Sequence, residues 1–138
     1  MFRAITRACT LSVALMCVCA SPSLAHSDRP AGITVTPVTS HKLPHVAGKS
    51  ITMVRVTLAP GSKDGAHRHA GAVTVYVLSG TVRTQIDDGP VATFKAGDTF
   101  FEAPGVVHSM IENPTNEPAE ILAVFVADDG AELTTPIK

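Results

Sequence analysis

Short apolar runs, separated by turn-forming residues, recur along most of the chain. The runs are rich in Val, Ile, Thr and Phe, which favour the half-buried surface of a β-sheet. Gly, Pro, Asn and Asp gather between the runs, and Asp88-Gly89 in particular indicates a tight hairpin. The pattern leaves little room for helix and predicts an all-β fold, either a sandwich or a barrel. The predicted strands are residues 33–39, 51–58, 73–78, 81–86, 91–94, 99–101, 106–111 and 121–126.

The first 25 residues have the pattern of a secretory signal peptide. Arg3 and Arg7 precede an apolar run from Thr10 to Ala20, and small residues stand at the cleavage site that ends at Ala25. The apolar run is shorter than the roughly 20 residues that a membrane helix needs. We therefore expect cleavage after Ala25 and a periplasmic or secreted protein that does not contact the membrane after processing.

Composition narrows the classes of partner. Without Arg3 and Arg7, nine basic and twelve acidic side chains remain, which gives a net charge of −3. This mild acidity, without basic clusters, argues against a nucleic-acid partner. All three cysteines fall within the leader, so the expected mature chain contains neither a disulfide nor a thiolate metal site. Its length suits one domain.

Three histidines carry the candidate chemistry. His67 and His69 are two residues apart, so in an extended segment both rings project from the same face. His108 comes from a strand about forty residues downstream. The side chains next to the pair offer no hydrogen-bond acceptor, and buried imidazoles without partners are costly. The sequence therefore predicts one divalent transition metal, Fe, Mn, Zn, Ni or Cu, on these histidines, with satisfied structural histidines as the alternative.

The spacing around the first two histidines resembles the first motif of the cupin family. That motif reads Gly, five residues, His-x-His, three or four residues, Glu, six residues, Gly. Here Gly61, His67, His69 and Gly80 occupy the expected positions, and Val73 stands at the position of the glutamate. The match in spacing indicates the family, and the missing glutamate leaves the usual carboxylate ligand unassigned.

The second cupin motif follows in the right order. It reads Gly, five residues, Pro-x-Gly, two residues, His, three residues, Asn. In this chain Gly97, Gly105 and His108 match it, whereas Pro104 and Asn113 each lie one position late. Two motifs in order make the resemblance specific for the fold, but much less specific for an activity, because cupins serve many functions.

The resemblance implies an antiparallel cupin β-barrel, also described as a double-stranded β-helix or jelly roll. We divide the chain into a signal peptide (1–25), an N-terminal arm with the first strand (26–49), the cupin domain (50–127) and a C-terminal tail (128–138). The first strand, 33–39, is a candidate for pairing with an edge of a second copy. Homodimerisation is therefore one expectation.

Glu102 is the one candidate for a catalytic residue. It stands just before the turn that leads to His108, so it can serve as a replacement ligand, as a hydrogen-bond acceptor beside the ligands, or as a general base. Strand alternation does not fix its direction, since Glu102 points outward if Phe101 fills the barrel. A solvated carboxylate at a strand end is the alternative interpretation.

Three neutral imidazoles would leave the full charge of a divalent ion, together with open positions, and so would favour anionic chelating ligands. We expect an exported metal-binding cupin that acts on or binds a small anionic molecule. The resemblance admits a dioxygenase-like enzyme or another metal-dependent enzyme. Two alternatives stay open. One is a non-catalytic periplasmic protein that binds a ligand or metal, and the other is a degenerate cupin with a structural or interaction role, in which Val73 only fills core space.

Overall fold

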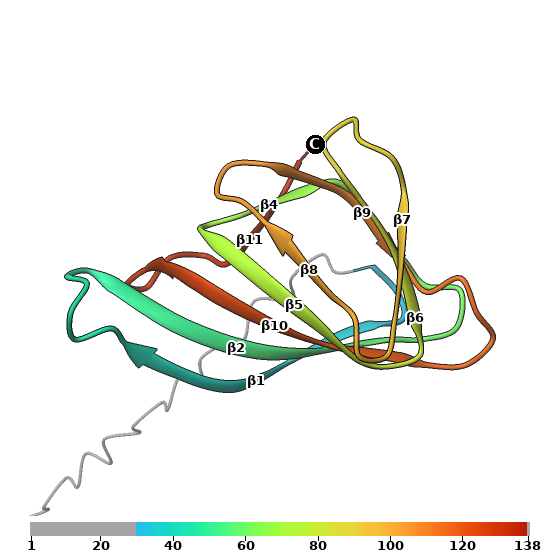
Figure 1. Cartoon of the computed structure of the whole chain (residues 1–138), viewed down its shortest axis with the longest axis horizontal. Helices are drawn as coiled ribbons and strands as arrows, with labels where there is room; N and C mark the ends of the chain where they lie inside the picture. Colours follow the sequence, from blue (N-terminus) through green and yellow to red (C-terminus); the bar gives the residue numbers. More distant parts are fainter. Residues whose placement is uncertain (1–29, 138) are drawn as a thin grey trace, which may run out of the picture.

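The computed structural model describes residues 30–137, and within them the chain forms eleven strands and no helix (Figure 1). Accordingly, nothing in this range has the form of an apolar helix that could cross a membrane. The predicted all-β class is confirmed, and the expected strands lie within a few residues of observed ones. The strands are β1 (Ile33–Lys42), β2 (Lys49–Leu58), β3 (Lys63–Asp64), β4 (His67–His69), β5 (Ala72–Ser79), β6 (Thr81–Ile86), β7 (Ala92–Lys95), β8 (Thr99–Glu102), β9 (Val107–Glu112), β10 (Ala119–Asp128) and β11 (Thr134–Pro136).

Two antiparallel sheets face each other. One has the order β1-β2-β10-β5-β8 and the other the order β11-β4-β9-β6-β7, with β3 paired to β9. Strands that follow one another in sequence often lie in different sheets, as β4 and β5 do, and β8 and β9. The chain therefore passes repeatedly between the two sheets, which is the double-stranded architecture that the resemblance to cupins implied (Figure 1).

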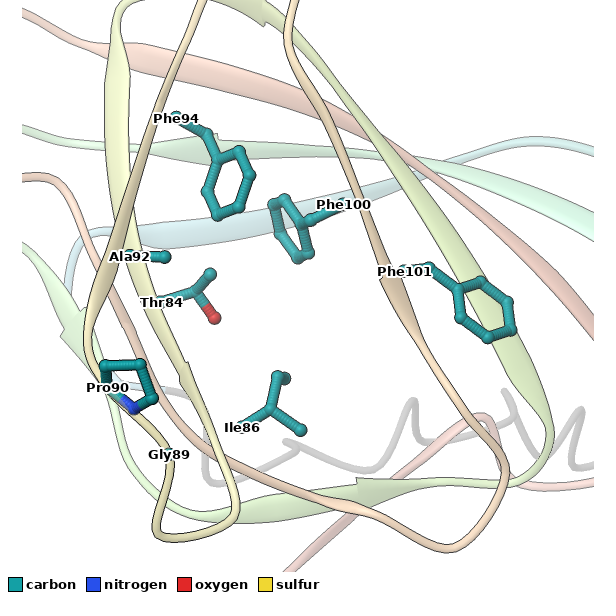
Figure 2. Close-up of a pocket in the computed structure, with 8 residues that line it drawn as sticks. All are labelled: Thr84, Ile86, Gly89, Pro90, Ala92, Phe94, Phe100 and Phe101. Carbon is teal, nitrogen blue, oxygen red and sulfur yellow. The ribbon is translucent and has the colours of Figure 1, made fainter.

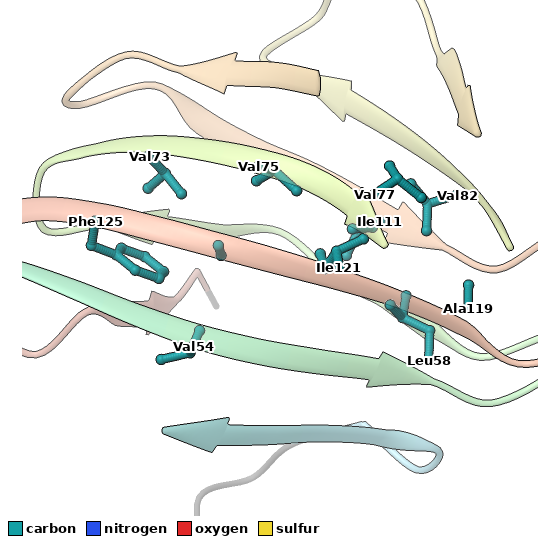
Figure 3. Packing of buried hydrophobic residues seen from close by; sticks show 11 residues of the cluster. Val54, Leu58, Val73, Val75, Val77, Val82, Ile111, Ala119, Ile121 and Phe125 are labelled. Carbon is teal, nitrogen blue, oxygen red and sulfur yellow. The ribbon is translucent and has the colours of Figure 1, made fainter. Parts of the chain in front are cut away.

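Alternating side chains of β5 and β10 form much of the apolar core between the sheets (Figure 3). Val73 and Val77 on β5 lie opposite Phe125 and Ile121 on β10, and all four are buried. Each side chain of this size contributes roughly 1.5–3 kcal/mol when it is fully removed from water. The hydrophobic positions with a period of two therefore set the register, because a shift by one residue would turn these side chains to the solvent.

The turn between β4 and β5 depends on a glycine. An ideal Cβ at Gly71 would lie 2.0 Å from the carbonyl oxygen of Val126, so any other residue would force the backbone apart. Close approach of this turn to β10 brings His69 against Phe125, with their ring centroids 5.2 Å apart. Gly71 thus helps to place the second histidine of the pair.

The two ends of the described chain both join sheets. The predicted strand at 33–39 is confirmed within β1, which pairs with β2 from Ile33 to Lys42 with one bulge at Val38 and forms an edge of its sheet. Within the predicted tail, β11 pairs with β4, and Thr134 lies opposite His69. The predicted leader, 1–25, and its cleavage site lie outside the described residues.

Candidate metal centre

The structure brings the three predicted histidines together on one face of the second sheet. His67 on β4 is the direct cross-strand partner of His108 on β9, and His69 follows on the same face of β4. One ligand nitrogen from each ring lies within 4.8 Å of the others. His67 and His108 are buried, and the His69 side chain is 11% exposed. The cluster therefore lies inside the barrel.

Backbone carbonyls orient two of the rings. His67 Nδ1 donates to the carbonyl of Gly65 at 2.8 Å, and His69 Nδ1 donates to the carbonyl of Leu133 at 3.0 Å. Because a carbonyl only accepts hydrogen bonds, each Nδ1 carries the proton and each neutral ring keeps a lone pair on Nε2. Such outer hydrogen bonds fix the tautomer of metal-binding histidines. The two rings are therefore prepared to bind a cation through Nε2.

The third ring is held by a side chain. His108 Nε2 lies 2.5 Å from Thr84 Oγ1 of β6, within the core. His108 Nδ1 is buried and, among residues 30–137, has no hydrogen-bond partner. This free nitrogen faces the carboxylate of Glu102, at 3.2 Å from Oε2. The hydroxyl of Thr84 thus leaves Nδ1 as the nitrogen that His108 presents to the cluster.

Glu102 enters the same space from β8 in the other sheet. Its side chain is 2% exposed, and its Oε2 lies 3.3 Å from His69 Nε2. The outward direction that we considered for Glu102 is wrong, because Phe101, at 59% exposure, lies on the outside. Phe100 instead packs against the core. Glu102 shares its strand face with Phe100, so alternation turns the carboxylate inward.

Burial lowers the pKa of His67 below the ordinary value of 6.5, because the interior solvates a charged ring poorly. The carbonyl of Gly65 acts in the opposite direction, and the neighbouring rings of His108 and His69 lower the pKa of His67 further. The neutral form is therefore favoured. That form keeps the lone pair that a metal ion requires.

The donor set fits a divalent transition metal. Glu102 Oε2 is a buried oxygen without a hydrogen-bond partner among the described residues, and it faces the acceptor nitrogen of His69 and the free nitrogen of His108. While the His69 ring is neutral, its Nε2 and Glu102 Oε2 are both acceptors, so their contact is attractive only if a proton or a metal ion lies between them. Imidazole nitrogen and carboxylate oxygen are the ligands that zinc, iron and manganese use.

A small pocket lies near the cluster, although neither Glu102 nor any of the three histidines lines it. It has a volume of about 210 Å³ and lies between the β6–β7 hairpin and β8 (Figure 2). Phe94, Phe100 and Phe101 contribute aromatic walls. Thr84 lines the pocket and also contacts His108, so the pocket and the histidine cluster share this side chain.

Other polar residues near the motifs lie outside the cluster. Arg68 is exposed, and its guanidinium donates to the carbonyl of Gly105 in the turn before β9. This contact ties β4 to that turn. His41 and His45 are exposed and lie outside the cluster.

Comparison with known proteins agrees with this architecture. The family model described as "Cupin domain" matches residues 54–125, a range that contains all three histidines and Glu102. An oxalate-binding protein of Thermotoga maritima is 37% identical over 78 residues, which are 56% of this chain and 64% of the relative. Germin-like protein 1-1 of Oryza sativa subsp. japonica is 30% identical over 105 residues, which are 72% of this chain and 48% of the relative. The chain thus spans about half to two thirds of the length of these curated relatives.

Solved structures show the same fold. A conserved protein with a double-stranded β-helix domain from Klebsiella pneumoniae superposes with a TM-score of 0.61 and 25% identity, over 86% of this chain and 90% of that chain. Oxalate decarboxylase from Bacillus subtilis superposes with a TM-score of 0.56 and 27% identity, over 63% of this chain but only 24% of that larger chain.

Proposed function

Because the chain belongs to the cupin family, we propose that it is a metal-dependent cupin that binds a small anionic chelating molecule. In this proposal His67, His69 and His108 hold one divalent transition ion, and the ion binds the anion. The observation that supports the proposal most directly is the convergence of three imidazole nitrogens, within 4.8 Å of one another, inside the barrel.

The residues of the chain supply orientation and a site of low polarity. The carbonyls of Gly65 and Leu133 and the hydroxyl of Thr84 fix the rings, so little ordering is needed when the ion binds. Phe125 packs its ring against His69 and limits solvation there. A bound ion supplies the positive charge that attracts a chelating anion, and this attraction is stronger in such surroundings than in water.

Oxalate is the first anion to test. The oxalate-binding protein of Thermotoga maritima is 37% identical to this chain over the shared segment, and oxalate offers two carboxylates to one ion. The nearby pocket that Thr84 lines, at about 210 Å³, is smaller than the roughly 300–1,000 Å³ of pockets for drug-sized ligands. Its size therefore favours a compact ligand.

Calorimetric titration of untagged protein tests this function. The protein is first stripped with a chelator and desalted, then titrated with Mn(II), Fe(II), Zn(II), Ni(II) or Cu(II), and finally with oxalate. We expect one equivalent of metal per chain, and oxalate binding only after metal loading. A His41→Ala variant is the matched control, because His41 is an exposed histidine outside the cluster.

Two results would contradict the proposal. One is the absence of stoichiometric metal binding by the wild-type protein, and the other is equal binding of oxalate with and without metal. Oxygen uptake and product analysis on the loaded protein separate a binding protein from a dioxygenase-like or other enzyme.

Export is also part of the proposal, and it rests on the sequence of residues 1–25. The intact mass of the protein from its native host tests it. We expect a mature chain that begins at His26. Retention of the first 25 residues would contradict cleavage at this site.

A further inference from the structure

This chain has Val73 where the first cupin motif has a glutamate, but Glu102 on the neighbouring strand provides a carboxylate beside that position. Val73 on β5 and Glu102 on β8 are direct cross-strand partners. The side chains of such a pair lie on the same face of the sheet, with Cβ atoms roughly 4.5–5.5 Å apart. Val73 is 1% exposed and Glu102 is 2% exposed, so both point into the barrel. A carboxylate at either position therefore enters the same interior space.

We propose that Glu102 is a ligand of the metal centre and supplies from β8 the carboxylate that position 73 on β5 does not. This inference rests on the proposed function, since it requires that the histidine cluster holds a metal ion. It assigns a fourth protein ligand, Glu102 Oε2, to the three imidazole nitrogens. It also explains why Val73 can be an apolar core residue without loss of the site.

The contacts of Glu102 favour a ligand over a general base or an outer hydrogen-bond acceptor. Its Oε2 lies 3.3 Å from His69 Nε2 and 3.2 Å from His108 Nδ1, the two nitrogens that face the centre. The Nδ1 proton of His69 is already donated to Leu133, so Nε2 has no proton to offer Glu102 while the ring is neutral. An outer acceptor would instead lie beside the distant nitrogens, where the carbonyls of Gly65 and Leu133 lie.

Burial leads to the same conclusion. An ionised carboxylate that is almost completely buried needs paired charge or a metal ion. Among residues 30–137, Glu102 Oε2 has no hydrogen-bond donor, and the groups that it faces are imidazole nitrogens. A divalent ion bound by these nitrogens would meet this requirement of the carboxylate directly.

A carboxylate ligand changes which metals and anions the centre prefers. It lowers the net charge of a divalent site from +2 to +1 and adds a hard oxygen donor. Carboxylate oxygen suits Mn(II) better than it suits softer ions, whereas imidazole serves Zn(II), Ni(II) and Cu(II) well. Removal of the Glu102 carboxylate should therefore weaken the binding of Mn(II) more than that of Ni(II).

Metal titration of four variants tests the assignment. Glu102→Gln keeps the shape of the side chain and removes its charge. The double variant Val73→Glu/Glu102→Val moves the carboxylate to β5 and preserves composition and total side-chain volume. Val73→Glu with Glu102 retained places both carboxylates in the site. Glu120→Gln is the matched control, because Glu120 on β10 lies next to the buried Ile121 and so faces the opposite side of the sheet.

We expect Glu102→Gln to weaken Mn(II) binding at least about 100-fold, since even outer partners of ligands account for about 10- to 100-fold. The loss for Ni(II) should be smaller than for Mn(II). Glu120→Gln should leave both affinities unchanged, and the double variant should recover most of the loss. The electron paramagnetic resonance spectrum of bound Mn(II) should differ between Glu102→Gln and the wild type and return toward wild type in the double variant.

The outcomes separate this inference from the proposed function. If the wild-type protein binds no metal, the proposed function fails. If it binds Mn(II) and Glu102→Gln binds it within about threefold, with an unchanged spectrum, Glu102 is not a ligand although the histidine site remains. If Glu102→Gln does not fold, the double variant decides: recovered binding supports the assignment, and a folded double variant without Mn(II) affinity overturns it.

Discussion

Two buried polar centres in the barrel differ in how completely the protein satisfies them. Asn113, near the end where Leu58 meets Ala119, is 1% exposed. Its Nδ2 donates to the carbonyls of Leu58 and Glu117 at 3.1 and 2.7 Å. Its Oδ1 accepts from the backbone and the hydroxyl of Thr115. Every polar atom of this side chain therefore has a partner within the chain.

The histidine cluster lies at the other end of β10, against Phe125. There Glu102 Oε2 and His108 Nδ1 are buried and have no hydrogen-bond partner among the described residues. Native interiors satisfy nearly all buried polar atoms, so an exception requires an explanation. The comparison indicates that Asn113 stabilises the fold, whereas the cluster is arranged for a species that the chain itself does not supply.

The largest effect should follow from loss of one imidazole. His67→Ala, His69→Ala or His108→Ala removes a ligand whose ring is already oriented, so metal affinity should fall about 1,000-fold, or roughly 4 kcal/mol. Competition titration against a metal-sensitive dye measures this loss, with His41→Ala as the control. Retention of affinity in all three variants would place the metal elsewhere and remove the contrast with Asn113.

Asn113→Ala should have its effect on stability alone. The substitution removes the amide that donates to the carbonyls of Leu58, Ala59 and Glu117 and accepts from Thr115, and should lower the unfolding free energy by roughly 1–3 kcal/mol. Urea unfolding measures the loss, and metal affinity should stay within about threefold. Asn116→Ala is the control, because Asn116 is exposed in the same loop and should change stability by less than about 0.5 kcal/mol.

Glu102→Gln should raise the unfolding free energy of the metal-free protein, whereas Asn113→Ala should lower it. An amide nitrogen can donate to His69 Nε2 or His108 Nδ1, where the carboxylate only accepts. We expect the metal-free variant to be more stable than the metal-free wild type by about 1 kcal/mol. With saturating Mn(II) the order should reverse, because only the wild type gains the full binding free energy. A loss of stability in the metal-free variant would make Glu102 a structural residue like Asn113.

The smallest effect should appear in the pH dependence of the metal-free protein. Burial lowers the pKa of His67 from 6.5, so below that pH the unfolded chain takes up a proton more readily than the folded chain. The contribution of His67 to stability is thus fully present above the unfolded pKa, and it is lost as the pH falls from there through the lower pKa of the folded state. Melting temperatures measured across this range in the presence of a chelator should show the decline, and His67→Gln should flatten it.

Much of the fold and the three histidines could be predicted from the sequence, because alternating apolar residues and His-x-His spacing are local signals. The direction of Glu102 could not be predicted in this way. Phe100 and Phe101 are adjacent on β8, so each face of this short strand carries one phenylalanine, and the hydrophobic pattern does not show which face points inward. Only the pairing of β8 with β5 shows that Phe101 lies outside and Glu102 inside.

The groups that orient the histidines were also missed, for a different reason. Gly65 and Leu133 act through backbone carbonyls, which every residue possesses, and Leu133 reaches His69 from 64 positions away in sequence. Thr84 is one of several threonines in predicted strands, and nothing local relates it to His108. Such contacts depend on tertiary packing and leave no pattern in a single sequence.

Anomalous diffraction from crystals of the zinc-loaded protein tests the central claim most directly. We predict one zinc peak per chain at about 2.0–2.2 Å from a nitrogen of each of His67, His69 and His108. A peak at the same distance from Glu102 Oε2 would place the carboxylate in the coordination shell as well. No peak in the barrel, or zinc only at exposed histidines such as His41, would contradict the account.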